Sequence, residues 1–453
     1  MSPAALPATE GLSQRLLLHR ERLQALHEQA RARYISHAAG LQVATLICEQ
    51  TERLIVAIFR ESLAGLSSAD EQLAADSVAV VAVGGTGRGG MAPYSDADLL
   101  FLRSNTAPAA CDPCILQAVR DCWDVGLHPG SDKILTPDDA LSSAVEEHTM
   151  ATSLVEARLL WGSERMFELF REKFRRKVVR NRYARFFAEC VAAREAERAQ
   201  FGVSDRQLEP DVKRSSGGLR DVHLLRWIGY AAYGTPDIDL LRRCDALSKE
   251  DADRMTSAHE FLTRVRVDLH YAAGKAQEVL TRDEQLRLAE LHGIPAVGSQ
   301  RPVERFMQLY LEHATSIADI TQRFVARHRP RPWRARLARF WFSHRNDEFI
   351  VSGGEIEARS AARETVCGSL EGMLKAYELA ALYTVRLSPA LTEDIRRSAG
   401  RLPRGIVSPA AAQSFLAILG ATDNVGHQLR DMCTSGLLEV VLPEWTHARC
   451  LLQ

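Results

Sequence analysis

The chain has 453 residues, which is enough for about three domains of ordinary size. It carries 57 Lys and Arg residues against 58 Asp and Glu residues, and the resulting formal net charge of −1 argues against binding to nucleic acid through bulk positive charge. Hydrophobic residues make up 46% of the chain, which is typical of folded globular proteins, and no apolar run approaches the roughly 18 residues that a membrane span needs. We therefore expect a globular protein that contacts neither nucleic acid nor a membrane.

The start of the chain and its cysteines indicate a cellular compartment. Residues 1–10 show no basic segment followed by an apolar core, so we expect no signal peptide. Nine cysteines, an odd number, are scattered along the chain, which favours reduced thiols over a disulfide framework. Cys111 and Cys114 form the one close pair, and a lone CxxC without a second pair gives little support to a zinc site. The sequence therefore predicts a cytoplasmic protein.

The first third of the chain combines helical and extended patterns. Residues 12–38 contain few Gly or Pro and predict one long amphipathic helix, and residues 45–63 predict another. Residues 77–83 form a short, β-branched run between an Asp and a Gly, which predicts a buried strand. Residues 98–103 predict a second strand, and residues 131–136 are a candidate for a third.

The rest of the chain is mainly helical in pattern. Residues 149–327 predict helices, with a polar, glycine-containing break at 201–218. A linker rich in Pro and Arg at 327–336 leads to a last region that begins with a hairpin around Gly353 and Gly354 before helices return. The whole pattern predicts an α+β fold in which a small mixed sheet is embedded in a mostly helical chain. We expect four segments, residues 1–70, 71–150, 151–330 and 331–453.

Two stretches are strongly basic. Residues 171–185 carry eight Lys or Arg residues, which predicts a solvated helix face, with a surface for a partner or a polyanionic ligand as the alternative. The linker at 327–336 is interpreted as a solvated connector rather than as an arm for nucleic acid.

Residues 84–98 directly follow the first expected strand and read Gly-Gly-Thr-Gly-Arg-Gly-Gly-Met-Ala-Pro-Tyr-Ser-Asp-Ala-Asp. Three of the glycines fit the dinucleotide-binding pattern G-x-G-x-x-G. That pattern requires a full helix next and an acidic residue about 20 positions on. Pro93 and the strand at 98–103 come too early for the helix, and the later position holds Arg103, so we do not expect a Rossmann site.

A nucleotidyltransferase site is the alternative interpretation of the glycine loop. Gly84, Gly85 and Gly87 at the end of a strand allow the backbone to approach a triphosphate. Backbone amides can then donate hydrogen bonds to the negatively charged phosphate oxygens. Arg88 adds a fork of hydrogen-bond donors for a phosphate. We therefore assign these four residues to nucleotide binding.

A pair of carboxylates follows the glycine loop. Asp96 and Asp98 are two positions apart at the start of a predicted strand, so both side chains should leave on one face. Two carboxylates on one face suit Mg²⁺, with Mn²⁺ as a substitute, and would align the attacking oxygen and the leaving group of a nucleotidyl transfer. We predict that both aspartates are catalytic and bind metal, and we assign the preceding Ser95 to nucleotide binding. A glycine-rich turn before an Asp-capped strand would be the purely structural explanation.

These residues resemble the nucleotidyltransferase domain of the bacterial PII uridylyltransferase/uridylyl-removing enzyme family. The sister family, glutamine synthetase adenylyltransferase, shares the glycine loop, but the residues here are closer to the uridylyltransferase. Further segments resemble the same family in the same order, from about residue 40 onward: Trp123–Leu127, Ala151–Leu160, Leu208–Lys213, Gly217–His223, Phe261–Arg266, Leu269–His270 and Val303–Met307.

The resemblance implies a polymerase β-like nucleotidyltransferase fold and a reaction. UMP would pass from UTP to a tyrosine hydroxyl of the signalling protein PII, and pyrophosphate would leave. Substrate and nucleotide identity come from the resemblance, because the residues themselves indicate metal-dependent nucleotidyl transfer and nothing finer.

The segment Gly217–His223 precedes and begins a predicted helix. The resemblance favours a place for Lys213, Arg220 and Asp221 on the nucleotide side of the cleft, together with Glu209. Ordinary capping charges at a helix start are the structural alternative. Arg266 and His270, four apart on one helix face, would serve the same cleft or form a structural ion-paired helix.

The sequence also departs from the family pattern. Thr86 stands where the family usually has Tyr, Gly90 where it usually has Glu, and residues 130–136 differ from the usual Gly-His-Ser-Val-Arg-Thr. These departures leave a degenerate, non-catalytic nucleotide- or PII-binding module as an alternative, beside adenylyl transfer to glutamine synthetase. Asp132 is a candidate for a third carboxylate.

Family members continue into a phosphohydrolase domain of the HD type and paired ACT domains. None of the 14 histidines here is followed by Asp, the pair that such a hydrolase needs for its metal. We therefore expect the transferase part of the family alone, without the hydrolase or the ACT domains.

Overall fold

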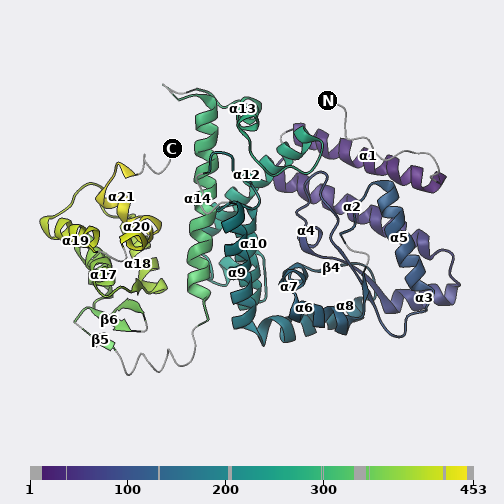
Figure 1. Ribbon diagram of the computed structural model, residues 1–453, viewed down its shortest axis with the longest axis horizontal. Coiled ribbons are helices and arrows are strands. Elements are labelled where there is room, and N and C mark those ends of the chain that lie inside the picture. Colours follow the sequence, from purple (N-terminus) through teal and green to yellow (C-terminus); the bar gives the residue numbers. More distant parts are fainter. Residues whose placement is uncertain are drawn as a thin grey trace. The chain divides into compact units, whose positions relative to one another are not determined.

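The computed structural model describes residues 13–36, 38–130, 133–201, 207–296, 298, 300–330, 343–345, 347–352, 354–421 and 425–445. The chain forms two compact units, residues 1–321 and 322–453. The first unit runs from purple to green in Figure 1 and contains the glycine loop. The finer division of the chain at residues 70 and 150 stays a prediction.

The α+β fold expected from the sequence is confirmed, because helices dominate and the strands form two small sheets. The first sheet has the order β3-β2-β1-β4, in which β1 pairs antiparallel with β2 and β4, and β2 pairs parallel with β3. Its strands are β1 (Val78–Ala82), β2 (Leu99–Arg103), β3 (Ile134–Leu135) and β4 (Arg158–Gly162). The three strands expected at 77–83, 98–103 and 131–136 are thus confirmed, and the sheet is mixed as the nucleotidyltransferase resemblance implied.

The fourth strand corrects the sequence prediction, which gave helix from residue 149 onward. β4 lies at one edge of the sheet beside β1. It is a short apolar run without a clear period, which sequence patterns do not distinguish from helix. Gly162 has a φ of +103°, and a Cβ there would lie 2.1 Å from the carbonyl oxygen of Val78, so the strand pairing requires glycine.

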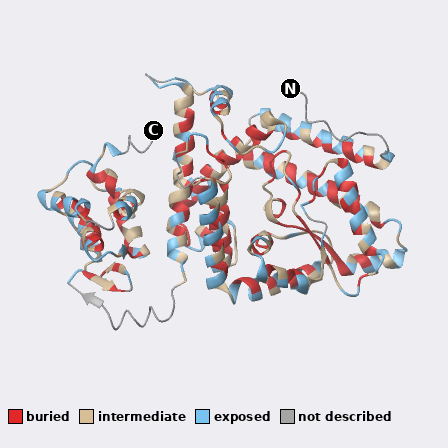
Figure 2. Cartoon of the chain, in the orientation of Figure 1, coloured by how far each residue is buried: buried red, intermediate tan, exposed pale blue. Residues whose placement is uncertain are grey.

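Four helices share one hydrophobic core with the first sheet: α1 (Gln14–Ile35), α2 (Gly40–Leu63), α3 (Ser68–Ser77) and α5 (Cys111–Val125). The two helices predicted at 12–38 and 45–63 are confirmed as α1 and α2. Phe59 of α2 is buried against the sheet, with ring centroids 6.5 Å from Phe101 and 4.9 Å from Trp161. Figure 2 shows the buried residues gathered on the inward sides of these helices and on the strands.

A second group of helices follows β3. It comprises α6 (Pro137–Glu146), α7 (His148–Leu154), α8 (Glu164–Phe174), the π-helix η1 (Arg175–Arg180) and α9 (Tyr183–Phe201). The basic stretch 171–185 lies on the last three. Six of its eight cations are exposed while Phe174, Val178 and Val179 are buried, so the predicted solvated helix face is confirmed.

The remaining helices of the first unit form a layer that contacts the N-terminal helices where α12 packs on α2. They are α10 (Leu219–Tyr233), α11 (Ile238–Arg243), α12 (Lys249–Ala273), α13 (Arg282–Leu291) and α14 (Pro302–His328), whose last residues belong to the second unit. Gly217, before α10, has a φ of +75°, and a Cβ there would lie 2.2 Å from the carbonyl oxygen of Ala314 in α14. The chain can therefore enter α10 this close to α14 only with glycine at this position.

The second unit has its own sheet, with the order β5-β6-β7-β8. The strands are β5 (Ser343–Arg345), β6 (Phe349–Ser352), β7 (Glu355–Ala358) and β8 (Arg386–Leu387), and the helices are α16 (Arg363–Gly368), α17 (Leu370–Leu382), α18 (Pro389–Ala399), α19 (Pro409–Leu419), α20 (Val425–Thr434) and α21 (Leu437–Val441). The hairpin expected around Gly354 is confirmed, because β6 and β7 pair antiparallel on either side of it. Most of the linker predicted at 327–336 lies outside the described residues.

Every cysteine in the described part of the chain is a free thiol. Cys111 is buried and Cys114 is partly buried, and no group of three or more His, Cys, Asp or Glu side chains with metal-binding geometry occurs among the described residues. Within the same residues, no helix combines the length and the apolar composition that a membrane crossing requires.

Candidate active site

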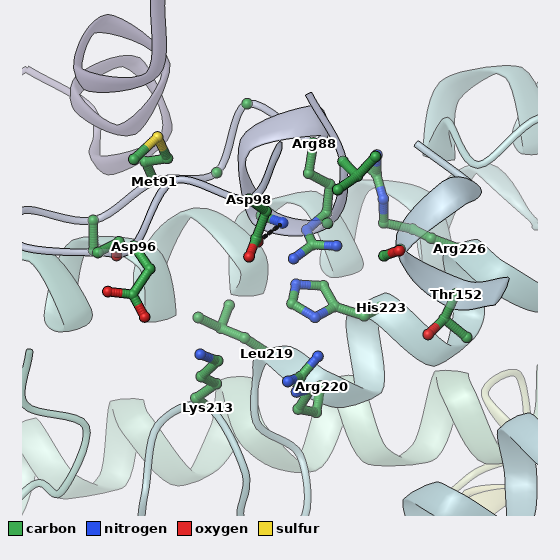
Figure 3. A pocket seen from close by; sticks show the side chains of 18 of the residues that line it. Arg88, Met91, Asp96, Asp98, Thr152, Lys213, Leu219, Arg220, His223 and Arg226 are labelled. Carbon is green, nitrogen blue, oxygen red and sulfur yellow. Dashed lines mark hydrogen bonds between the residues drawn. The ribbon is translucent and has the colours of Figure 1, made fainter. Parts of the chain in front are cut away.

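A cleft of about 1430 Å³ opens between the end of the first sheet and the helical layer that follows it. Its walls come from the segment between β1 and β2, from α7, and from α9, α10, α12 and the loops next to them. Figure 3 shows side chains from these elements facing one another across the cleft. Eight of the residues that the sequence assigned to the site line it: Gly84, Gly85, Arg88, Ser95, Asp96, Asp98, Lys213 and Arg220.

The glycine loop turns sharply at the end of β1 into the one-turn helix α4 (Gly84–Gly87). Gly84 has a φ of +51°, and a Cβ on it would lie 2.6 Å from Oδ2 of Asp98, so both backbone conformation and space require glycine. The amide of Gly85 donates a hydrogen bond to the same Oδ2 at 2.7 Å. Gly87 faces away from the cleft, because a Cβ there would lie 2.4 Å from the carbonyl oxygen of Glu156. Its place in the structure is therefore close packing against the chain behind the loop.

The two aspartates lie immediately before β2, which begins at Leu99. Ala97, between them, forms an isolated parallel bridge with Pro129, and this extended stretch directs both carboxylates into the cleft (Figure 3). Asp96 is exposed and Asp98 is half-buried. Two hard oxygen ligands at alternate positions of an extended stretch fit a divalent cation that would take its remaining ligands from water and phosphate. Asp132, the candidate third carboxylate, lies outside the described residues, as does Ser131.

A hydrogen-bond network holds the glycine loop from behind. Thr86 is fully buried, and its hydroxyl accepts a hydrogen bond from the amide of Asp98 at 2.8 Å. Arg158 of β4 donates to the carbonyl oxygens of Gly87 at 2.7 Å and Thr86 at 3.0 Å, and it is also paired with Glu52 of α2. The sequence prediction missed Arg158, although it lies within the segment Ala151–Leu160 that carried part of the resemblance.

Arg88 points into the cleft from the end of α4 (Figure 3). Its Nη1 lies 2.8 Å from Oε2 of Glu156, whose other oxygen accepts from Nε of Arg226 at 2.5 Å. The Glu156 side chain is almost completely buried, at 3% exposure. One buried carboxylate therefore fixes two arginines from different elements, which leaves this end of the cleft positively charged.

The opposite wall carries Lys213, whose ammonium lies 3.9 Å from Oε1 of Glu278. Burial, reinforced by the nearby charge of Arg266, lowers the pKa of Lys213 to about 8. Burial alone would raise the pKa of Glu278, but His270 and Arg266 beside it hold that pKa well below its usual range. Arg266 and Glu278 form an ion pair of 2.8 Å, and Nδ1 of His270 donates to the carbonyl oxygen of Pro93. Arg266 and His270 were expected to share one helix face, toward the cleft or in a structural ion-paired helix. Arg266 lines the cleft, and His270 is fully buried.

Two of the acidic residues assigned to the cleft lie elsewhere. Asp221 is fully buried and accepts hydrogen bonds from Arg194 at 2.6 Å, Arg198 at 2.7 Å and the amide of Gly217 at 2.7 Å. It therefore fixes the turn into α10 and is not among the residues that line the cleft. Glu209 accepts from the amide of Arg282 at 3.0 Å and is likewise not a lining residue.

Two histidines at the cationic end of the cleft were not assigned to the site from the sequence. Burial, followed by Arg88 and Arg220, lowers the pKa of His223 well below its usual value. Burial, followed by Arg226 and Arg88, lowers the pKa of His259 to about 3. Both imidazoles are therefore neutral at physiological pH in the empty cleft. The one sequence signal for His223 was its place at the end of the segment Gly217–His223.

Comparisons with known proteins show which proteins the sequence resembles. Residues 185–325 match the family model described as GlnD PII-uridylyltransferase. The bifunctional uridylyltransferase/uridylyl-removing enzyme of Phenylobacterium zucineum is 32% identical over 298 residues, which are 66% of this chain and 32% of the relative. The corresponding enzyme of Azospirillum brasilense is 28% identical over 424 residues, which are 92% of this chain and 45% of the relative. That of Bradyrhizobium diazoefficiens is 29% identical over 436 residues, which are 92% of this chain and 46% of the relative.

The chain spans about a third to a half of the length of these curated relatives. The family model covers the wall with Lys213 and Arg220, and the longer matches extend over 92% of the chain. The family resemblance inferred from the sequence motifs is thus confirmed: residues 185–325 match the PII-uridylyltransferase family model, and up to 92% of the chain is similar to bifunctional uridylyltransferase/uridylyl-removing enzymes.

Proposed function

We propose that this chain transfers UMP from UTP to a tyrosine hydroxyl of a PII signalling protein and releases pyrophosphate. One observation carries the proposal: the glycine loop, two carboxylates at alternate positions and two cationic side chains from a separate helical layer line a single cleft. The nucleotide is inferred from the names of the relatives, PII from the description of the family model, and the tyrosine from the family resemblance. Free thiols and balanced charge support a cytoplasmic site of action without nucleic acid.

The triphosphate would lie between the glycine loop and the helical layer. Gly84 and Gly85 have no side chains that would keep a phosphate from the backbone, and Arg88 offers donors from the end of α4. Lys213 and Arg220 face them from the other wall (Figure 3). We infer that these residues bind and orient the nucleotide.

Asp96 and Asp98 would hold Mg²⁺, or Mn²⁺ in its place. Their fit rests on the donor set, because two carboxylates reach the cleft and Asp98 is held by the amide of Gly85. A bound divalent ion would neutralise the negative charge that develops on the phosphates.

The two ends of the cleft differ in charge, and this suggests an orientation for the reaction. In an in-line displacement, the tyrosine oxygen forms its bond to the α-phosphorus on the side opposite to the bond that breaks. The electron pair of the broken bond leaves with pyrophosphate, which the cationic end around Arg88 and Arg220 would accept. The acceptor tyrosine would then approach past Asp96, which is exposed, and its phenolic proton would pass to solvent.

The test is a transfer assay with labelled UTP, Mg²⁺ and PII. Parallel reactions use labelled ATP, and glutamine synthetase as the acceptor. Label on PII from UTP alone is expected. Label on glutamine synthetase from ATP would identify an adenylyltransferase, and no label in any reaction would favour a non-catalytic binding module.

A further inference from the structure

His223 lies in the second turn of α10 with its ring directed into the cleft. Figure 3 shows the imidazole between the guanidinium groups of Arg88 and Arg220. The residue is only 7% exposed. Its Nδ1 is buried and has no hydrogen-bond partner in the part of the chain that the structure describes.

A buried nitrogen without a partner is costly, because its desolvation is not repaid by a hydrogen bond. Nothing in the packing of α10 supplies that partner: the nearest aromatic contact is Trp227, whose ring centroid is 6.1 Å away. A group that enters the cleft can therefore satisfy Nδ1, and the charges around the ring decide which kind of group it is.

The surroundings of His223 are cationic. In addition to burial, the positive charges of Arg88, Arg220 and Arg226 all lower the pKa of its ring. Two carboxylates contact these arginines. Glu156 lies between Arg88 and Arg226, and Glu197 lies 3.5 Å from Nε of Arg220. Three arginines against two carboxylates leave an excess of positive charge, which excludes a cationic ligand and favours an anion with several acceptor oxygens.

We propose that Nδ1 of His223 is a ligand of the pyrophosphate portion of the bound nucleoside triphosphate and of the pyrophosphate that leaves. This assignment rests on the proposed function of the same cleft and adds a binding residue to it. The burial that keeps the imidazole neutral in the empty cleft leaves one ring N–H, and a phosphate oxygen can accept a hydrogen bond from it.

Inorganic pyrophosphate is the probe, since it needs neither the acceptor protein nor catalysis. Its affinity for the full chain is measured by titration calorimetry with Mg²⁺ present, for the wild type, His223→Leu and His223→Asn. Leu removes the nitrogen, and the amide of Asn places a donor near the position of Nδ1. We expect roughly tenfold or more weaker binding for His223→Leu, and affinity within about threefold of the wild type for His223→Asn.

His313→Leu and His313→Asn are the matched controls, because His313 stacks on Phe261 with ring centroids 4.5 Å apart and does not line the cleft. Both should bind pyrophosphate as the wild type does. Thermal unfolding of every variant shows whether the fold is retained. If His223→Leu does not fold, the imidazole nitrogen resonances of the wild type decide: a shift of the Nδ1 resonance with pyrophosphate supports the assignment, and an unchanged resonance overturns it.

The outcomes separate this assignment from the proposed function. Equal pyrophosphate affinity of wild type and His223→Leu would overturn the role of His223 even if UMP transfer to PII is observed. Weaker binding by His223→Leu in a chain that transfers no UMP would retain the pyrophosphate ligand and overturn the transferase proposal. A folded wild type that does not bind pyrophosphate at millimolar concentration would overturn the assignment.

Discussion

The hydroxyl of Thr86 accepts a hydrogen bond of 2.8 Å from the backbone amide of Asp98. Thr86 lies in the glycine loop and Asp98 lies before β2, so this bond joins the two halves of the candidate site behind the cleft. Thr86 is also one of the positions where the sequence departs from the family pattern, which usually has Tyr. The departure therefore does not disconnect the loop from the carboxylates, because the smaller hydroxyl makes a contact of its own within this chain.

Replacing Thr86 by Val should weaken both the fold and the site. The change keeps the shape of the side chain but removes the acceptor for the Asp98 amide, and an unsatisfied buried amide costs about 1–3 kcal/mol. We expect urea denaturation to show a loss of this size, and the rate of UMP transfer to fall. Thr86→Ser, which keeps the hydroxyl, should retain most of the activity. If the Val and Ser variants transferred UMP at the same rate, the contact would have no part in positioning Asp98.

Replacing Asp96 or Asp98 by Asn should abolish transfer and leave the fold intact. Each change removes a charge that a divalent cation needs but keeps the size of the side chain, and in Asp98→Asn the side-chain amide oxygen could still accept from the backbone amide of Gly85. Labelled UTP with PII measures the activity, and circular dichroism measures the fold. Transfer by the double variant at a rate near that of the wild type would contradict the two-carboxylate site.

The strand, the glycine loop and the aspartate pair could be predicted because their signals are local. A β-branched run bounded by Asp76 and Gly84 indicates a buried strand by itself. The spacing of Asp96 and Asp98 directs both side chains to one face of an extended chain. Neither inference requires knowledge of any residue far away in the sequence.

Other features depend on contacts between distant segments and were not predictable in this way. The role of Asp221 is set by Arg194 and Arg198, which reach it from α9, and the sequence placed this carboxylate in the cleft. Glu156 joins Arg88 to Arg226, which are 138 positions apart in the sequence. The strand β4 has an apolar pattern compatible with helix, and its pairing with β1 decides its conformation.

Lys213 should make phosphate binding depend on pH. Its pKa is lowered to about 8, chiefly by burial and then by Arg266, so in the empty cleft its positive charge is present below pH 8 and is lost as the pH rises above it. A phosphate ligand prefers the charged form. The affinity for pyrophosphate should therefore fall between pH 7 and pH 9, by up to about tenfold if binding requires the charge.

Lys213→Arg provides the control for this pH dependence, because a guanidinium keeps its charge throughout the range. Its pyrophosphate affinity, measured by titration calorimetry at the same pH values, should change much less between pH 7 and pH 9. An equally steep loss of affinity in Lys213→Arg would assign the pH dependence to another group.

Asp221→Asn should act on stability rather than on nucleotide binding. The change removes the fully buried counter-charge of Arg194, whose side chain is 2% exposed, and leaves it the partly exposed Glu197 at 2.8 Å. Breaking a buried pair in this way costs about 3–5 kcal/mol. Urea denaturation measures this loss. Glu168→Gln, which breaks an exposed pair with Arg171, is the matched control and should cost less than about 1 kcal/mol. A stable Asp221→Asn variant with a raised KM for UTP would return Asp221 to the nucleotide site.

Arg220→Ala should weaken the handling of the nucleotide without a comparable loss of stability. Arg220 lines the cleft, and its side chain is 33% exposed with one long contact of 3.5 Å to Glu197, so little of the fold depends on it. A charge-assisted hydrogen bond to phosphate contributes about 1.5–3 kcal/mol, which corresponds to a KM for UTP raised roughly tenfold or more, or to an equivalent fall in kcat. Arg301→Ala, at an exposed arginine paired with Glu304 outside the cleft, should leave both constants unchanged.

Steady-state kinetics with UTP as the varied substrate and thermal unfolding of both variants check this expectation. Unchanged kinetics in an Arg220→Ala protein of normal stability would assign the start of α10 a structural role alone.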